Sequence, residues 1–239
     1  MNRFGKRFVT KSIGVVGGLG PETTAEFYLN LIKDSRRYLL NYPKIIISSV
    51  PFPFFLENEI IFKSRNERKI LSFLEKSIVE LNKLNVDFIV IPCNTVHIFI
   101  KLLRKKSDAP IINIVDETVK FVKEHNYATV GILATNKTID SKLYESPLRN
   151  ENLKVILPRK KEQTIVARII LRLLSNKNSN HDKLILNRLI KSLEKRGAEV
   201  IILGCTDLQL ILKQNNFKIP IIDSMIVLEK TVFKKICEG

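Results

Sequence analysis

Short runs that are apolar at nearly every position recur along the whole chain, and amphipathic stretches separate them. One such run is residues 88–91 (FIVI), and two of the amphipathic stretches are residues 68–84 and 163–174. Strands that are apolar on both faces are typical of parallel sheets covered by helices on two sides. The sequence therefore predicts an α/β fold. The expected strands are residues 12–16, 44–50, 87–92, 111–115, 128–133, 153–157, 199–203 and 219–222.

One pattern occurs twice in the chain. Residues 88–100 (FIVIPCNTVHIFI) and 200–212 (VIILGCTDLQLIL) each place four apolar residues and one Pro or Gly before a cysteine. Small polar residues follow each cysteine, and apolar residues return at offsets +3, +5, +6 and +7. Residues 110–113 (PIIN) and 220–223 (PIID) extend the match. Because buried parallel strands resemble one another, chance similarity is the alternative explanation.

The repeat divides the chain into two similar Rossmann-like domains, which we expect to be related by a pseudo-two-fold axis. The first domain is predicted at residues 1–115 and carries Cys93. The second is predicted at residues 116–223 and carries Cys205. The last segment, residues 224–239, is expected to form a helix that packs back on the first domain.

Each of these two cysteines is expected just beyond a strand and at the start of a helix, where ligands bind in open α/β sheets. A helix N-terminus favours a thiolate, so we expect a thiol pKa below the usual ~8.5. If the domains face each other, one thiolate can remove a proton from a carbon while the opposite thiol delivers one to its other face. That arrangement predicts stereoinversion. For either cysteine alone, a packed core thiol is the alternative, and Cys237 is expected to be inert.

Composition narrows the remaining functional classes. The net charge is +16, but the basic residues are spread along the chain without a nucleic-acid motif, so we expect no nucleic-acid partner. Three cysteines and three scattered histidines predict neither a disulfide scaffold nor a metal site. No apolar run is long enough to cross a membrane, and the first apolar stretch is too short for a signal peptide. We expect a cytoplasmic protein without a membrane partner.

Five segments together resemble the aspartate/glutamate racemase family of cofactor-independent amino-acid racemases, over roughly residues 12–223. Each segment is short, and their order and spacing carry the resemblance. The segments are IGVVGGLGPETTAEFY (13–28), SSVPFP (48–53), PCNT (92–95), LATNKTIDSKLY (133–144) and LGCTD (203–207).

The resemblance implies a homodimer that uses neither pyridoxal phosphate nor a metal and interconverts L- and D-aspartate, or glutamate. Cys93 and Cys205 are then the two catalytic acid/base residues. The small-molecule amino-acid substrate is expected to contact the residues that match the family's pocket, together with a nearby lysine. These residues are Leu19, Gly20, Ser49, Asn94, Thr95, Thr135, Lys161, Thr206 and Asp207.

Two positions depart from the family pattern. Phe55 and Thr164 stand where aspartate-specific members carry basic residues. Lys161 and its basic neighbours could replace those anchors or form a solvated loop, and Phe55 could favour a less acidic or bulkier side chain. The alternatives are therefore a broad-specificity amino-acid racemase or a maleate- or hydantoin-type two-cysteine isomerase. A catalytically silent binding module for small carboxylates or nucleic acid is the alternative from another class. His97 is expected to be a hydrogen-bonded structural residue rather than an assistant to the thiol.

Overall fold

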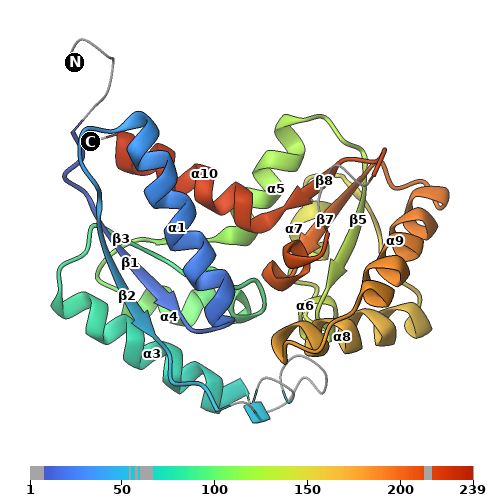
Figure 1. Cartoon of the computed structure of the whole chain (residues 1–239), viewed down its shortest axis with the longest axis horizontal. Coiled ribbons are helices and arrows are strands. Elements are labelled where there is room, and N and C mark those ends of the chain that lie inside the picture. Colours follow the sequence, from blue (N-terminus) through green and yellow to red (C-terminus); the bar gives the residue numbers. More distant parts are fainter. Residues whose placement is uncertain (1–7, 54, 57–58, 60–66, 213–216, 239) are drawn as a thin grey trace.

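The computed structural model describes residues 8–53, 55–56, 59, 67–212 and 217–238, and it contains two four-stranded parallel sheets (Figure 1). The strand orders are β2-β1-β3-β4 and β6-β5-β7-β8, so the two halves have the same topology. All eight expected strands are present, and the α/β prediction is confirmed. They are β1 (Ser12–Gly17), β2 (Lys44–Ser49), β3 (Phe88–Val90), β4 (Ile111–Ile112), β5 (Thr129–Ala134), β6 (Lys154–Ile156), β7 (Val200–Gly204) and β8 (Ile221–Asp223).

The inner strands of each sheet determine where a ligand can bind. β1 pairs with β3 through Val15 opposite Val90, and β5 pairs with β7 through Ile132 opposite Ile202. β1, β3 and β7 are buried along their whole length, as the apolar sequences of β3 and β7 predict. From one inner strand of each sheet the chain crosses to the outer strand on one side, and from the other inner strand it crosses to the outer strand on the other side. These diverging connections create a crevice beyond the carboxyl ends of the inner strands.

Helices cover both faces of the sheets, and the amphipathic stretches at 68–84 and 163–174 lie in α3 and α8 as predicted. Among the described helices, none is long and apolar enough to cross a membrane. The helices are α1 (Pro21–Tyr38), α3 (Glu67–Lys83), α4 (Ile100–Lys106), α5 (Ile114–Glu124), α6 (Asn136–Asp140), α7 (Glu145–Asn150), α8 (Lys160–Leu174), α9 (Asn180–Lys195), α10 (Ser224–Cys237) and the 3₁₀ helices η1 (Thr95–Phe99) and η2 (Thr206–Leu210).

The C-terminal helix α10 lies against α1 and α5, which joins the end of the chain to its first half (Figure 1). The side-chain amide of Asn30 in α1 donates to Glu229 in α10 over 3.0 Å. Thr231 of α10 donates to Glu117 of α5 over 3.3 Å. The domain boundary predicted after residue 115 falls inside α5, so the connection between the halves is helical.

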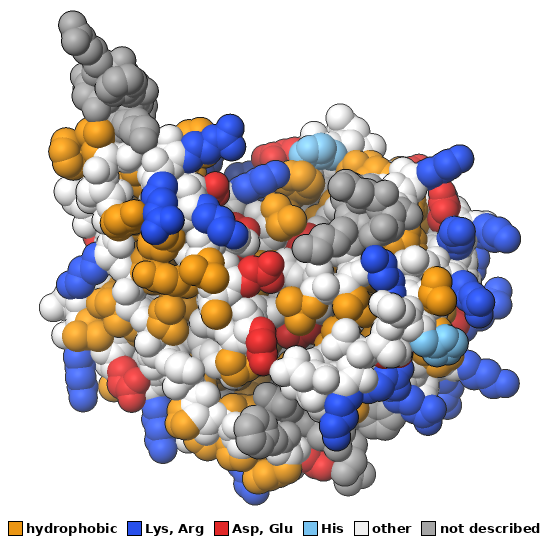
Figure 2. Space-filling view, viewed as in Figure 1, with side chains coloured by type: hydrophobic (Ala, Val, Ile, Leu, Met, Phe, Trp, Pro, Cys, Tyr) orange, Lys and Arg blue, Asp and Glu red, His pale blue; other side chains and the backbone are white. Residues whose placement is uncertain are grey.

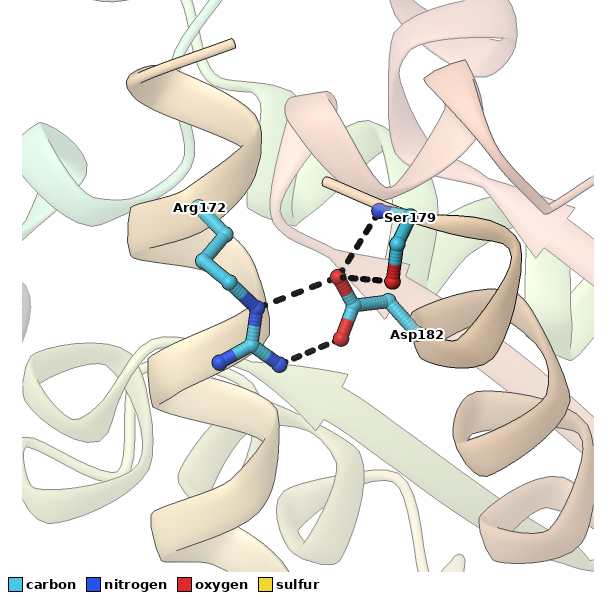
Figure 3. A network of polar contacts seen from close by, with 3 residues as sticks. All are labelled: Arg172, Ser179 and Asp182. Carbon is cyan, nitrogen blue, oxygen red and sulfur yellow. Dashed lines mark hydrogen bonds and ion pairs between the residues drawn. The ribbon is translucent and has the colours of Figure 1, made fainter. Parts of the chain in front are cut away.

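The start of α9 is fixed to α8 by one buried carboxylate (Figure 3). Asp182 has a side chain only 2% exposed, and it accepts hydrogen bonds from Arg172 of α8 over 3.1 Å and from the backbone N–H of Ser179 over 3.0 Å. The Arg172 guanidinium lowers the pKa of Asp182 because it favours the ionised carboxylate. This ion pair holds the last turns of α8, and α8 ends at Leu174.

On the face drawn in Figure 2, basic side chains are spread out rather than gathered into one stripe. Figure 2 shows Lys and Arg around the margin of one face, with apolar and acidic groups between them. This distribution matches the spread of basic residues along the sequence.

Candidate active site

A cavity of about 50 Å³ is lined by residues from both halves of the chain, and both repeat cysteines are among them. Nine of the eleven predicted site residues line it, whereas Ser49 and Lys161 are exposed and do not. The lining residues are Leu19, Gly20, Phe52, Ile70, Cys93, Asn94, Thr95, Val96, Thr135, Leu174, Cys205, Thr206 and Asp207.

The shared topology places the two thiols at equivalent positions in the two halves. Cys205 directly follows β7, and Cys93 lies three residues beyond β3, the corresponding strand of the other sheet. Cys93 is half-buried, and Cys205 is 6% exposed. Each cysteine precedes a short 3₁₀ helix, η1 or η2, and η1 continues directly into α4.

Cys205 is held in its protonated form. Burial raises its pKa well above the usual range, and the Asp207 carboxylate and Cys93 raise it further. Its Sγ donates to Oδ2 of Asp207 over 3.5 Å. The expectation of a lowered pKa is therefore wrong for Cys205. The loss of hydration destabilises the thiolate more than the N-terminus of a short helix stabilises it.

His97 holds the backbone at Cys93. Its Nδ1–H donates to the carbonyl oxygen of Cys93 over 2.7 Å, so its Nε2 is the acceptor that faces the backbone N–H of Ile114 at 3.5 Å. Burial lowers the pKa of His97 to about 4, which keeps the ring neutral. His97 does not line the cavity. It is a structural histidine that connects Cys93 to the start of α5.

The Asn94 amide is fixed from both sides by residues that the sequence analysis did not single out. Its Nδ2 donates to Ser224 over 2.9 Å, and Ser224 donates to the carbonyl of Leu203 over 2.8 Å. The Tyr144 hydroxyl donates to Oδ1 of Asn94, and burial raises the pKa of Tyr144. The one available signal for Tyr144 was its place in the matched segment 133–144.

Three threonine hydroxyls join the two halves beside the cavity. Thr95 lies 3.0 Å from Thr135 and 3.2 Å from Thr138, oxygen to oxygen. Thr135 also caps α6, because its Oγ1 accepts the backbone N–H of Thr138 over 3.1 Å. Thr95 and Thr135 are both among the residues that line the cavity.

The glycine turn after β1 brings backbone against the site. Gly20 has a φ of 58°, which favours glycine, and a Cβ there would lie 2.8 Å from Oδ1 of Asp207. Thr23 donates to the Gly20 carbonyl over 3.0 Å and fixes the turn. This close approach is the physical reason for glycine at this position.

The ionisable groups of the described cavity wall are the two thiols and Asp207. Within the described ranges, no three His, Cys, Asp or Glu side chains gather closely enough to hold a metal ion. The two thiols and the carboxylate are groups that can accept and donate protons.

The chain is similar to known proteins over most of its length. The sequence profile described as Asp/Glu/Hydantoin racemase matches residues 16–231. The chain is 30% identical to the broad specificity amino-acid racemase RacX of Bacillus subtilis over 224 residues, which cover 92% of this chain and 95% of that protein.

Solved structures share the fold. An aspartate racemase homologue from Pyrococcus horikoshii matches with a TM-score of 0.77 at 26% identity, covering 95% of this chain and 100% of that one. The aspartate racemase of Picrophilus torridus matches with a TM-score of 0.78 at 23% identity, covering 95% of each chain. The chain therefore belongs to the Asp/Glu/Hydantoin racemase family and is an isomerase.

Proposed function

We propose that the chain racemises an α-amino acid without a cofactor, with Cys93 and Cys205 as the acid/base pair at Cα. The observation that carries this proposal is that both thiols line one cavity and come from corresponding strand ends of the two sheets. A base and an acid that approach from different halves can act on opposite faces of one carbon, as inversion requires.

The raised pKa of Cys205 supports Cys205 as the acid of the first step, with Cys93 as the base. The base takes the Cα proton and the electron pair of the broken C–H bond stays on Cα. Cys205 then donates its proton to the other face. The thiolate and thiol have exchanged places at the end, so the enzyme is ready for the opposite enantiomer.

Uncharged polar groups are suited to bind the α-carboxylate. The hydroxyls of Thr95, Thr135 and Thr206 and the amide of Asn94 all line the cavity. Hydrogen bonds to a carboxylate are stronger than those between neutral groups. The Asn94 amide is already fixed by Ser224 and the Tyr144 hydroxyl, so binding it costs little side-chain entropy.

The wall favours the broad-specificity alternative over an aspartate or glutamate racemase. Phe55 is 61% exposed, and Thr164 donates to the Lys160 carbonyl over 3.0 Å. Neither residue lines the cavity, and Lys161 is exposed. The described part of the wall thus offers no cation to a second carboxylate. The relative RacX is itself named a broad specificity amino-acid racemase.

Deuterium exchange at Cα tests the mechanism. Purified enzyme is incubated in D₂O with L- or D-amino acids, and the Cα–H signal is followed by NMR. Cys93→Ser and Cys205→Ser should each reduce racemisation by roughly 10²- to 10⁴-fold, because each removes one acid/base group. Cys237→Ser is the matched control, since Cys237 does not line the cavity, and should retain full activity. Near-normal racemisation in both single variants would rule out the two-thiol mechanism.

A further inference from the structure

The apolar part of the cavity wall belongs to one continuous core cluster. Phe52, Ile70 and Leu174 pack in this cluster, and so do the side chains of Cys93 and Cys205. A substrate whose Cα lies between the two sulfurs therefore has apolar groups of both halves beside it. Once the polar wall residues bind the α-carboxylate, these apolar groups remain for the substrate side chain.

Phe52 and Leu174 are held in place from outside the cavity. The Phe52 ring meets Phe73 of α3 edge to face, with centroids 5.9 Å apart. Leu174 ends α8, whose last turns are anchored through Arg172 to α9 (Figure 3). Ile70 is completely buried in the first turn of α3. The apolar surface is thus built from helices and packed rings, which makes it a defined subsite.

The electrostatics of the wall oppose a second carboxylate. Beyond the two thiols, the ionisable residue of the described wall is Asp207, an acid. A carboxylate in an apolar, partly closed site loses hydration and needs a cation or several donors in exchange.

We propose that Phe52, Ile70 and Leu174 form a side-chain subsite that selects amino acids with apolar side chains over aspartate and glutamate. The inference rests on the proposed racemase function and defines its substrate class.

A substrate panel separates this inference from the function on which it rests. Cα deuterium exchange is measured for alanine, valine, aspartate, glutamate and lysine with the wild-type enzyme. We expect kcat/KM for alanine or valine to exceed that for aspartate by at least about 100-fold, the scale on which unpaired buried groups discriminate. Preference for aspartate, glutamate or lysine would overturn the subsite while leaving the racemase proposal intact. Exchange with none of the five would contradict both.

Placing a cation in the subsite is a second test of the inference. Leu174→Arg should raise the ratio of aspartate to alanine activity by at least about 10-fold, because it supplies the missing partner for a side-chain carboxylate. Leu184→Arg is the matched control, since Leu184 is 55% exposed on α9 and gains the same charge outside the cavity. Circular dichroism confirms that both variants are folded. An unchanged ratio in folded Leu174→Arg would exclude Leu174 from the subsite.

Discussion

Acid should weaken the fold through one buried histidine. The pKa of His97 is about 4 in the folded protein and 6.5 for an ordinary histidine. The unfolded chain therefore binds more protons between these values, and stability falls as the pH falls. This difference in pKa corresponds to ~3 kcal/mol of unfolding free energy, at 1.36 kcal/mol per pKa unit. About 2 kcal/mol of this stabilisation is lost between roughly pH 7 and 5. Protonation would also turn Nε2 into a donor facing the Ile114 N–H, which is itself a donor.

Urea unfolding at several pH values measures this loss. Carboxylates contribute their own pH dependence, so the informative quantity is the difference in unfolding free energy between the wild type and His97→Asn. The asparagine amide can still donate to the Cys93 carbonyl, but it cannot bind a proton in this range. The variant is less stable near neutral pH, and its disadvantage should shrink by about 2 kcal/mol between roughly pH 7 and 5.

The same substitution at His125 is the control. His125 is exposed and its Nδ1 meets the Phe121 carbonyl at 2.8 Å, the same local contact without the burial. The difference between wild type and His125→Asn should stay constant with pH. Parallel stability curves for the wild type and His97→Asn would show that burial of His97 does not control its protonation, and would refute the reasoning.

Two further predictions concern residues that shape the cavity. Tyr144→Phe leaves the buried Oδ1 of Asn94 without this donor, so urea unfolding should show a loss of about 1–3 kcal/mol, with a higher KM because Asn94 is less well fixed; an unchanged stability would show that the hydroxyl contributes nothing. Gly20→Ala forces a Cβ against Asp207 at a positive φ, so kcat/KM should fall by more than about 10-fold. Gly197→Ala is the control: Gly197 also has a positive φ but open space around it, so this substitution should lower stability without lowering kcat/KM.

The strands and the cysteine pair were predictable because each has a strong local signature. β3 and β7 are apolar at every position, which is what burial on both faces requires. The repeat placed Cys93 and Cys205 at equivalent strand ends of the two sheets, and the packing of the two halves against each other brings them to one cavity. The short 3₁₀ form of η1 and η2 was not predictable, because polar residues after a strand favour an α-helix start equally well.

The apolar wall of the cavity was missed for a different reason. Ile70 and Leu174 lie on amphipathic helices, where a residue that lines a cavity has the same pattern as one that fills the core. Tyr144 and Ser224 contact Asn94 across 50 and 130 residues of sequence, a distance that periodicity cannot detect. Lys161 was predicted to contact the substrate because it lies close in sequence to a position of the family pattern. Its side chain is exposed and does not line the cavity.

The two cysteine motifs differ two residues after the sulfur, where one has Thr95 and the other Asp207. Two mirror-image amino acids with a single stereocentre are equally stable in water, so no racemase can enrich either of them at equilibrium. The Haldane relation then requires equal kcat/KM in the two directions. A carboxylate beside only one sulfur can make the directions unequal only in kcat and KM separately, and the enantiomer that saturates the enzyme at lower concentration is turned over more slowly in the same proportion.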